Sequence, residues 1–431
     1  MNQGIWAFGP PSLLMAVMVA GIHNPLVVSL CLSVLAGLGT YKAIPLVSDV
    51  FIAHGRSGKD LLKEGRPVIP ESMGAIAGVV YFIVMFVFIP VPFIGWFRDS
   101  EYALADFPHN KFAQFLGGLL SLMSMLFLGF ADDVLDIRWR VKIWLPLIAS
   151  MPLLMVYCVT YGGTDVVVPI PLRSLFGQKM LHLGIFYYAF MAALAIFSTN
   201  AINILAGVNG VEAGQSLVIA LSIAANDFLQ LHRNPARAEA HLTSLYFVLP
   251  FIGVTLGFLK HNWYPARAFG GDTLCYFAGM IFAVVGILGN FSKTVLLFMV
   301  PQIFNFIYSC PQLFHFVECP RHRMPSYNSS TKLLEPTWCS LSKTGKLGRL
   351  MIRILRTFRL VHIRRDPKTG EAVQANNLTL MNLLLVKFGP MSEPRLATFV
   401  MIVQALCSCL AFLIRYRLVK FVYNEVEDNR N

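Results

Sequence analysis

The sequence predicts an all-α membrane protein that crosses the bilayer about ten times, with a small mixed α/β insertion between the ninth and tenth spans. Of its 431 residues, 56% are hydrophobic and 13% are charged, whereas about a quarter of the residues in an ordinary soluble domain are charged. So much apolar side chain cannot all be buried in the core of a water-soluble protein of this size. The composition therefore excludes a soluble enzyme of the usual kind, and lipid is expected to cover much of the surface.

Long apolar runs bounded by charge, proline or glycine give the predicted spans. A bilayer core of about 30 Å needs about 20 helical residues. The segment 10–22 comes first, has no basic residue ahead of it, and is expected to pack on the first span rather than act as a signal peptide. The eight cysteines lack metal-binding spacing and are expected to be small buried hydrophobes. We expect membrane spans at 25–47, 75–97, 112–131, 143–161, 185–206, 211–231, 242–260, 273–290, 294–317 and 396–414.

Lysine and arginine in alternate loops predict the orientation. The loops at 48–74, 132–142 and 318–395 are basic, whereas the loop at 98–111 is net acidic. Because basic loops stay on the cytosolic side, these three loops are expected to be cytosolic and both termini to lie on the opposite side. The net charge of +12 is then a feature of membrane topology, and no nucleic-acid partner is expected.

The loop at 318–395 is too long for a simple connection and is expected to carry structure of its own. Between 349 and 359, apolar and arginine residues alternate at helical spacing, which favours a basic amphipathic helix lying on anionic headgroups. A loop whose positive charge merely keeps it cytosolic explains the pattern equally well. The segment 366–370 then predicts a hairpin turn between short strands.

An acidic cluster, Asp132, Asp133 and Asp136, lies at the end of the third predicted span, directly before the basic segment 138–142. If the helix continues, Asp132 and Asp136 lie on one face. Carboxylates crowded at a membrane edge repel one another unless a cation compensates them, and Mg²⁺ prefers oxygen ligands together with a bound diphosphate. The cluster alone is equally consistent with a solvated loop in which acids and bases pair.

Amide side chains gather where the fifth span ends and the sixth begins. Asn200 and Asn203 lie on one helical face, and Asn209 follows between Gly207 and Gly210, which allow a ligand to approach the backbone. Amides coordinate a cation or bind a nucleobase without the cost of burying a charge. Contacts between membrane helices are the alternative use of asparagine and glycine here.

Three further polar groups lie on the predicted cytosolic side. Asp272 directly precedes the eighth span, where it is alternatively an N-cap. The segment 321–323, Arg-His-Arg between two prolines, is a cationic group suited to phosphate and sugar oxygens. Glu71 opens the second span. Because all five groups are predicted on one side, together they indicate a site for a metal and a diphosphate.

The strings that carry these groups resemble the eukaryotic branch of the polyprenyl-phosphate hexosamine-1-phosphate transferase superfamily, over nearly the whole chain. The resemblance rests on IPES, FLGFADDVLDIRWR, TNAINILAGVNGVEAGQS, HNWYPARAFGGDT and CPRHRMP. It implies a ten-span, homodimeric protein of the endoplasmic reticulum membrane whose Mg²⁺-dependent active site faces the cytosol. The implied reaction transfers GlcNAc-1-phosphate from UDP-GlcNAc to dolichyl phosphate and releases UMP, the first step of lipid-linked oligosaccharide assembly for protein N-glycosylation.

The resemblance also implies roles for single residues and segments. The implied division of the chain is 1–317 with nine spans and the catalytic loops, 318–395 for sugar recognition, and 396–431 with the tenth span and a lumenal tail. The implied catalytic residues are Asp132, Asp133, Lys142 and Asp272, with Asn203 and Asp272 on Mg²⁺ and Lys142, Asn200 and Asn203 on dolichyl phosphate. The implied UDP-GlcNAc contacts are Lys59, Asp60, Leu61, Glu71, Trp139, Asn209, Phe269, Arg321, His322 and Arg323.

Two other functions compete with this one. A membrane prenyltransferase also binds a prenyl diphosphate through Mg²⁺ on an Asp-Asp-x-x-Asp string, but such enzymes usually carry a second acidic motif, and here there is the single Asp272. A transporter for a nucleotide sugar or a lipid places its polar groups near the bilayer midplane. In this sequence the polar groups collect at one predicted face.

Overall fold

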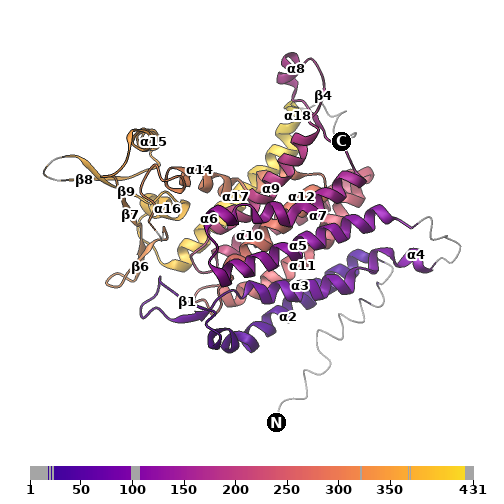
Figure 1. Cartoon of the computed structure of the whole chain (residues 1–431), viewed down its shortest axis with the longest axis horizontal. Coiled ribbons are helices and arrows are strands. Elements are labelled where there is room, and N and C mark those ends of the chain that lie inside the picture. Colours follow the sequence, from indigo (N-terminus) through magenta and orange to yellow (C-terminus); the bar gives the residue numbers. More distant parts are fainter. Residues whose placement is uncertain are drawn as a thin grey trace, which may run out of the picture.

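The computed structural model describes residues 24–98, 107–320, 323–366 and 370–422, together with residues 18, 21 and 368. The chain folds into a bundle of long helices that run side by side, and a mixed insertion of short strands and helices lies at one end of it (Figure 1). This architecture confirms the predicted fold class, a polytopic helical membrane protein with a small α/β insertion.

Every predicted span corresponds to a helix or to a pair of consecutive helices. The second predicted span is interrupted, because α3 (Gly74–Phe88) is followed by a 3-10 turn (Val91–Phe93) and by α4 (Ile94–Arg98). The other long helices are α2 (Pro25–Ala53), α5 (His109–Leu135), α7 (Leu145–Thr160), α9 (Ile185–Ile204), α10 (Val211–Arg233), α11 (Ala238–Asn262), α12 (Gly271–Leu288), α13 (Ser292–Phe298), α14 (Val300–Leu313) and α17 (Glu393–Leu413).

Eight of these segments, counted in the described part of the chain, are long and apolar enough to cross a bilayer. A ninth candidate is broken, since α13 and α14 meet at an angle of 71°. The predicted count of ten differs at α10, which has sufficient length but falls short in hydropathy. Its polar residues, among them Gln215 and Asp227, are buried inside the protein rather than turned toward lipid.

Buried amide side chains join four of the helices. Gln302 of α14 donates to Gln215 of α10 at 2.9 Å and to Gln404 of α17 at 2.7 Å. Gln404 in turn donates to the carbonyl of Phe298, the last residue of α13. Because apolar helices gain no hydrophobic energy from meeting in lipid, such hydrogen bonds and close packing hold the bundle together.

The helix α12 is the centre of the bundle. Of its residues, 89% are buried, and it packs against α5, α9, α11 and α3. Close approach to α9 depends on Gly279, where a Cβ atom would lie 2.3 Å from the Cα atom of Thr199. The first turn of this central helix therefore has a fixed position relative to the ends of its neighbours.

The insertion consists of short antiparallel strands and two helices. β5 (Ser326–Asn328) pairs with β6 (Leu333–Glu335), and β9 (Ala372–Asn376) lies between β7 (Trp338–Ser340) and β8 (Ile363–Arg365). The helices are α15 (Lys346–Thr357) and α16 (Leu380–Phe388). These elements confirm the predicted basic helix and the predicted hairpin between β8 and β9. The insertion also packs on the bundle, because residues of α16 share one buried cluster with Leu62, Leu205 and Leu396.

The remaining elements are connections at the bundle ends. β1 (Ser57–Lys59) pairs with β2 (Val68–Pro70), and β3 (Asp165–Val167) pairs with β4 (Met180–His182), both antiparallel. The short helices are α6 (Trp139–Lys142), α8 (Ile170–Phe176) and α18 (Val419–Val422). The β1–β2 hairpin lies at the same end of the bundle as the insertion (Figure 1).

Candidate active site

The predicted polar groups meet at one end of the bundle. Lys142 of α6 donates a hydrogen bond to Asp272, in the first turn of α12, at 2.9 Å, and it lies 3.0 Å from Asp132 of α5. Asn203, near the end of α9, donates to the other oxygen of Asp272 at 2.9 Å. The carboxylate of Asp272 thereby joins α6 and α9 to α12, and Lys142 joins α5 to the same centre.

The two neighbouring aspartates of α5 have different partners. Asp132 is buried and accepts the hydroxyl of Tyr276 at 2.9 Å as well as the ammonium of Lys142. Asp133 instead accepts the backbone N–H groups of Asp272 at 2.7 Å and of Thr273 at 3.2 Å, and the Thr273 hydroxyl at 2.5 Å. Asp133 is therefore the cap of α12, contributed by another helix.

This capping arrangement decides between the two readings of Asp272. Asp272 does not cap its own helix, so its carboxylate is directed to Lys142 and Asn203. Asp133 is occupied by donors at the start of α12, and its predicted catalytic role stays a prediction. Gly271 makes the approach possible: its φ of +70° suits glycine, and a Cβ atom there would lie 2.3 Å from a carboxylate oxygen of Asp133.

The condition under which Asp132 and Asp136 would share a helical face is not met. The helix α5 ends at Leu135, and Asp136 adopts the left-handed conformation with φ of +48°. Arg56 donates to the carbonyls of Asp133 and Val134 at the helix end, where a cation is favoured by the helix dipole. Asp136 therefore does not share a helical face with Asp132.

A second carboxylate, Glu212 in the first turn of α10, holds the loop that leads into α12. It accepts the backbone N–H of Gly270 at 2.9 Å and the side-chain amide of Asn262 at 2.9 Å. Asn262 also donates to the carbonyl of Ala268 at 3.1 Å. The loop between α11 and α12 is thus fixed at both of its ends.

The first loop is tied to the last span by a group of buried charges. Lys63 pairs with Asp60 at 2.9 Å and also with Glu393 at the start of α17. Asn209 joins both acids, because its side chain donates to Asp60 at 3.1 Å and its backbone N–H donates to Glu393 at 2.9 Å. Asp60 and Asn209 are both buried, so their hydrogen bond is shielded from water.

These groups surround an open cleft of about 330 Å³, here called the polar cleft. Eight predicted site residues line it: Lys59, Asp60, Leu61, Glu71, Asn203, Asn209, Phe269 and Asp272. Sequence reasoning had proposed no role for several others, including Glu212, Asn262, Cys275 and Met324. This volume lies within the usual range of small-molecule sites, and the cleft adjoins the acidic centre through Asp272 and Asn203.

Glu71 lies beside Phe269 at the wall of the polar cleft, and a Cβ atom on Gly58 would contact both side chains. Partial loss of hydration there raises the pKa of Glu71, and the nearby carboxylates of Asp133 and Asp272 raise it further, against an opposing effect of Arg56. The arrangement concentrates negative charge at one wall of the cleft.

Arg323 is the described member of the predicted Arg-His-Arg segment. Its backbone carbonyl accepts the side chain of Asn382 at 2.7 Å, and its Nη1 is buried with no hydrogen-bond partner within the described residues. Burial lowers the pKa of this guanidinium. A buried donor without a protein partner is suited to an anionic or sugar oxygen of a ligand.

Four predicted residues remain, and the structure describes the side chain of one of them, Asn200. Arg321 and His322 lie outside the described residues, and the side chain of Trp139 is likewise not described. Asn200 donates to the carbonyl of Ile196 in its own helix at 2.8 Å. Its assignment to dolichyl phosphate stays a prediction, as do the other residue roles.

The donor set at the centre fits a magnesium ion. Asp272 offers carboxylate oxygens, and a rotation of the Asn203 amide brings its oxygen beside them, since the amide nitrogen and oxygen exchange places by such a flip. Within the described ranges, no three His, Cys, Asp or Glu side chains cluster as a metal site. Mg²⁺ commonly takes one or two protein ligands and fills its shell with water and substrate phosphate.

Comparison with known proteins identifies the family. Residues 115–290 match the sequence model of glycosyl transferase family 4. The UDP-N-acetylglucosamine–dolichyl-phosphate N-acetylglucosaminephosphotransferase of Schizosaccharomyces pombe is 47% identical to this chain. The match covers 98% of this chain and 98% of that protein. The protein of the same name from Saccharomyces cerevisiae is 44% identical, and the match covers 90% of this chain and 90% of that protein. The one from Dictyostelium discoideum is 42% identical, and the match covers 88% of this chain and 86% of that protein.

The chain belongs to the UDP-N-acetylglucosamine–dolichyl-phosphate N-acetylglucosaminephosphotransferase family. The segment shared with glycosyl transferase family 4 contains Asp132, Lys142, Asn203 and Asp272 but ends before the insertion. Arg323, in the insertion, lies outside that segment.

Proposed function

We propose that this protein transfers GlcNAc-1-phosphate from UDP-GlcNAc to dolichyl phosphate, giving GlcNAc-diphosphodolichol and UMP. The relatives named for this activity match the chain over nearly its whole length. The observation that carries the proposal is the meeting of Asp272, Lys142 and Asn203 at one end of a membrane bundle. A prenyltransferase or a transporter has no comparable support.

In the reaction, an oxygen of dolichyl phosphate attacks the β-phosphorus of UDP-GlcNAc. A new phosphorus–oxygen bond forms, and the bond from the β-phosphorus to the bridging oxygen breaks, so that UMP leaves with that oxygen. Little covalent work remains for the protein beyond alignment and charge neutralisation. Near neutral pH a phosphomonoester is already largely ionised, so the attacking oxygen needs no strong base.

Lys142 is proposed to hold the phosphate of dolichyl phosphate. Its ammonium is paired with Asp132 and Asp272, which fixes the flexible side chain at the acidic centre while leaving it 20% exposed. An incoming phosphate then meets an oriented cation. Asp272 and Asn203 are proposed to bind Mg²⁺, which neutralises phosphate charge when present. Asp133 is a positioning residue, since it acts on the backbone of Asp272.

The nucleotide end of the donor is proposed to occupy the polar cleft. Asn209 and Phe269 offer an amide and an aromatic ring for uracil, and Asp60 is held beside them by Asn209. Arg323 is proposed to bind the diphosphate or the sugar through its unpartnered Nη1. Arg321, His322 and Trp139 are assigned to the same end of the donor on the resemblance alone.

The surroundings of the enzyme form part of the proposal. We place it as a homodimer in the endoplasmic reticulum membrane, with the polar cleft toward the cytosol, both termini lumenal, and the chain divided at 317 and 395. The basic loops support this orientation. In sealed microsomes, a membrane-impermeant amine reagent should label Lys343 from outside; labelling only after the vesicles are opened would reverse the orientation.

The activity is tested on the purified full chain with UDP-GlcNAc, a short polyprenyl phosphate and MgCl₂, by following UMP. We expect Asp272→Ala to abolish UMP release, because it removes the partner of both Lys142 and Asn203. The same replacement at the exposed Asp49 of α2 is the matched control and should leave the rate unchanged. Release of UMP by Asp272→Ala at the wild-type rate would refute the proposed centre.

A further inference from the structure

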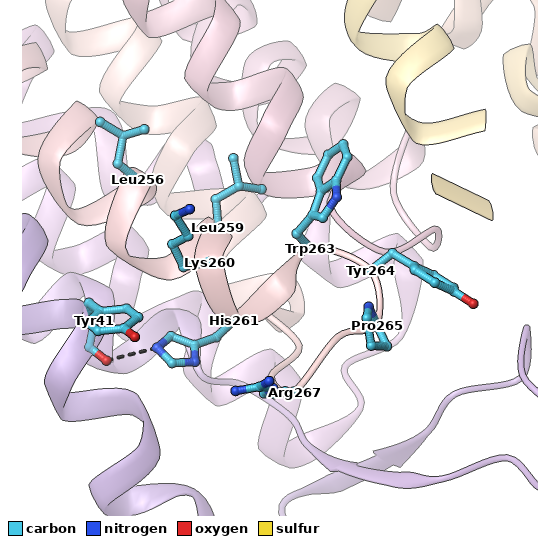
Figure 2. Close-up of a pocket in the computed structure, with 9 residues that line it drawn as sticks. All are labelled: Tyr41, Leu256, Leu259, Lys260, His261, Trp263, Tyr264, Pro265 and Arg267. Atoms are coloured by element: carbon cyan, nitrogen blue, oxygen red, sulfur yellow. Dashed lines mark hydrogen bonds between the residues drawn. The ribbon is translucent and has the colours of Figure 1, made fainter. Parts of the chain in front are cut away.

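A second cleft, of about 470 Å³, lies between α2 and the end of α11. It shares no lining residue with the polar cleft. Figure 2 shows Tyr41 of α2 and His261 of α11 side by side, with Lys260 on one side of the pair and Arg267 on the other. This second cleft is here called the basic cleft and is lined by Tyr41, Leu256, Leu259, Lys260, His261, Trp263, Tyr264, Pro265 and Arg267.

The basic cleft lies at the border between the lipid and the end of the bundle. α2 and α11 are both candidate spans, and α11 ends at Asn262, directly after the basic residues. Leu256, one turn further into the span, is 48% exposed although it is apolar, so its side chain faces the surface that lipid covers. Tyrosine and tryptophan, which Tyr41 and Trp263 supply, are typical of this level of a membrane protein.

The charge of the basic cleft has one sign. Lys260 and Arg267 are exposed, and no carboxylate belongs to its lining. The Nε2 of His261 lies 2.8 Å from the carbonyl of Tyr41. A carbonyl only accepts hydrogen bonds, so this nitrogen carries the proton and Nδ1 is left for another partner. Two cations and an imidazole thus face a common opening without an acid to neutralise them.

The chemistry of the opening indicates its ligand. Phosphate oxygens suit the ammonium of Lys260 and the guanidinium of Arg267, and basic pockets between membrane helices bind anionic lipid headgroups. The leucines supply an apolar wall on the membrane side, which matches the first carbons of an acyl chain. Inorganic phosphate gains nothing from that wall. We propose that the basic cleft binds the headgroup phosphate of an anionic membrane phospholipid.

The proposal is tested by measuring lipid binding to the purified, delipidated full chain with native mass spectrometry. The probes are dioctanoyl phosphatidic acid, dioctanoyl phosphatidylcholine and inorganic phosphate. We expect phosphatidic acid to bind more tightly than phosphatidylcholine. The double replacement Lys260→Gln and Arg267→Gln should weaken phosphatidic acid binding at least about tenfold, since both charged donors to the phosphate are lost. The single replacement Lys260→Gln should weaken it at least about threefold.

Lys42→Gln is the matched control, because Lys42 is exposed on α2 next to Tyr41 yet is absent from the lining of the basic cleft. We expect this variant to bind phosphatidic acid like the wild type. An equal loss in Lys42→Gln would show that surface charge alone attracts the lipid, and would overturn the proposal. Displacement of the lipid by inorganic phosphate at equal concentration would also overturn it, because the apolar wall would then contribute nothing.

Thermal unfolding of each variant provides the check on folding. If the double variant fails to fold, Lys260→Gln decides the matter, since its exposed side chain belongs to no described hydrogen bond or ion pair, whereas Arg267 lies in the loop leading to Asp272. Unchanged phosphatidic acid binding by the folded Lys260→Gln variant would refute the assignment. UMP release by the same preparations reports separately on the proposed transferase function.

Discussion

Replacing Asp133 by alanine separates a positioning role from a catalytic one. In the structure this carboxylate accepts two backbone N–H groups and one hydroxyl at the start of α12, at 2.7, 3.2 and 2.5 Å. The Thr273 hydroxyl can rotate to another acceptor, but the N–H groups of Asp272 and Thr273 cannot. A buried donor left without a partner costs about 1 to 3 kcal/mol, and loss of an N-cap costs about 1 kcal/mol.

We therefore expect Asp133→Ala to lower the free energy of unfolding by about 2 to 4 kcal/mol. Asp133→Asn keeps one acceptor oxygen and should lose about half as much. Both variants should also need more Mg²⁺ for half-maximal UMP release, because the backbone of Asp272, a proposed Mg²⁺ ligand, is no longer held. The first turn of α12 then moves relative to Lys142 and Asn203.

The assay pairs thermal unfolding of the purified protein in detergent with UMP release over a series of Mg²⁺ concentrations. Asp49→Ala is the control for loss of an exposed carboxylate and should match the wild type in both readouts. If Asp133→Ala unfolds at the wild-type temperature but releases no UMP, Asp133 acts on the reacting phosphates and the capping argument is wrong. If both readouts are unchanged, the capping hydrogen bonds carry no energy and the argument is equally wrong.

Two more variants test Arg323 of the insertion and Glu71 of the polar cleft. Arg323→Gln should raise KM for UDP-GlcNAc at least about tenfold, which is the value of one charge-assisted hydrogen bond. The free energy of unfolding should be unchanged or higher, because the variant removes a cation whose buried Nη1 has no partner among the described residues. Arg349→Gln on the exposed face of α15 is the control, and an unchanged KM in Arg323→Gln would remove Arg323 from the donor site. The pKa of Glu71 is raised in the folded protein, so the ionised carboxylate destabilises the fold once the pH rises above 4.5, the ordinary pKa of a glutamate. Glu71→Gln should therefore unfold at a slightly higher temperature than the wild type at pH 8, and this difference should vanish toward pH 4.5. A difference in unfolding temperature that does not change with pH would contradict the raised pKa.

The sequence predicted the spans well because each span depends on local composition. Apolar runs of about 20 residues located every long helix, including both halves of the bent pair α13 and α14. The bend itself, the end of α5 at Leu135 and the polar character of α10 were not predicted. These features depend on which side of a helix faces protein, and a hydrophobic run carries no such information.

The site was predictable as a set of residues but not as a set of partners. The cluster strings named Asp132, Lys142, Asn203 and Asp272, and the structure brings these four together. It could not be foreseen that Asp133 caps α12, because that contact joins residues 139 and 140 positions apart.

Glu212, Lys63 and Glu393 were missed for the same reason. Lys63 and Glu393 are separated by 330 positions, and neither stands in a distinctive local pattern. A charged residue within a span is costly unless it has a partner or a function. Glu212 carried that signal, because it lies two residues after the Asn209-Gly210 string and inside the predicted span 211–231.

The balance of charge in the polar cleft determines how the donor must bind. Four carboxylates line the cleft, against the single cation Lys59 among its described lining residues; they belong to Asp60, Glu71, Glu212 and Asp272. A diphosphate placed there alone would be repelled, since like charges a few ångströms apart disfavour each other strongly. Positive charge must therefore accompany the donor, and the chain has two provisions for it: the oxygen donors of Asp272 and Asn203 for a divalent ion, and the buried guanidinium of Arg323. The proposed Mg²⁺ site therefore predicts that the cleft binds a metal-bound nucleotide more tightly than a free one, because the metal ion offsets the repulsion between its carboxylates and the diphosphate.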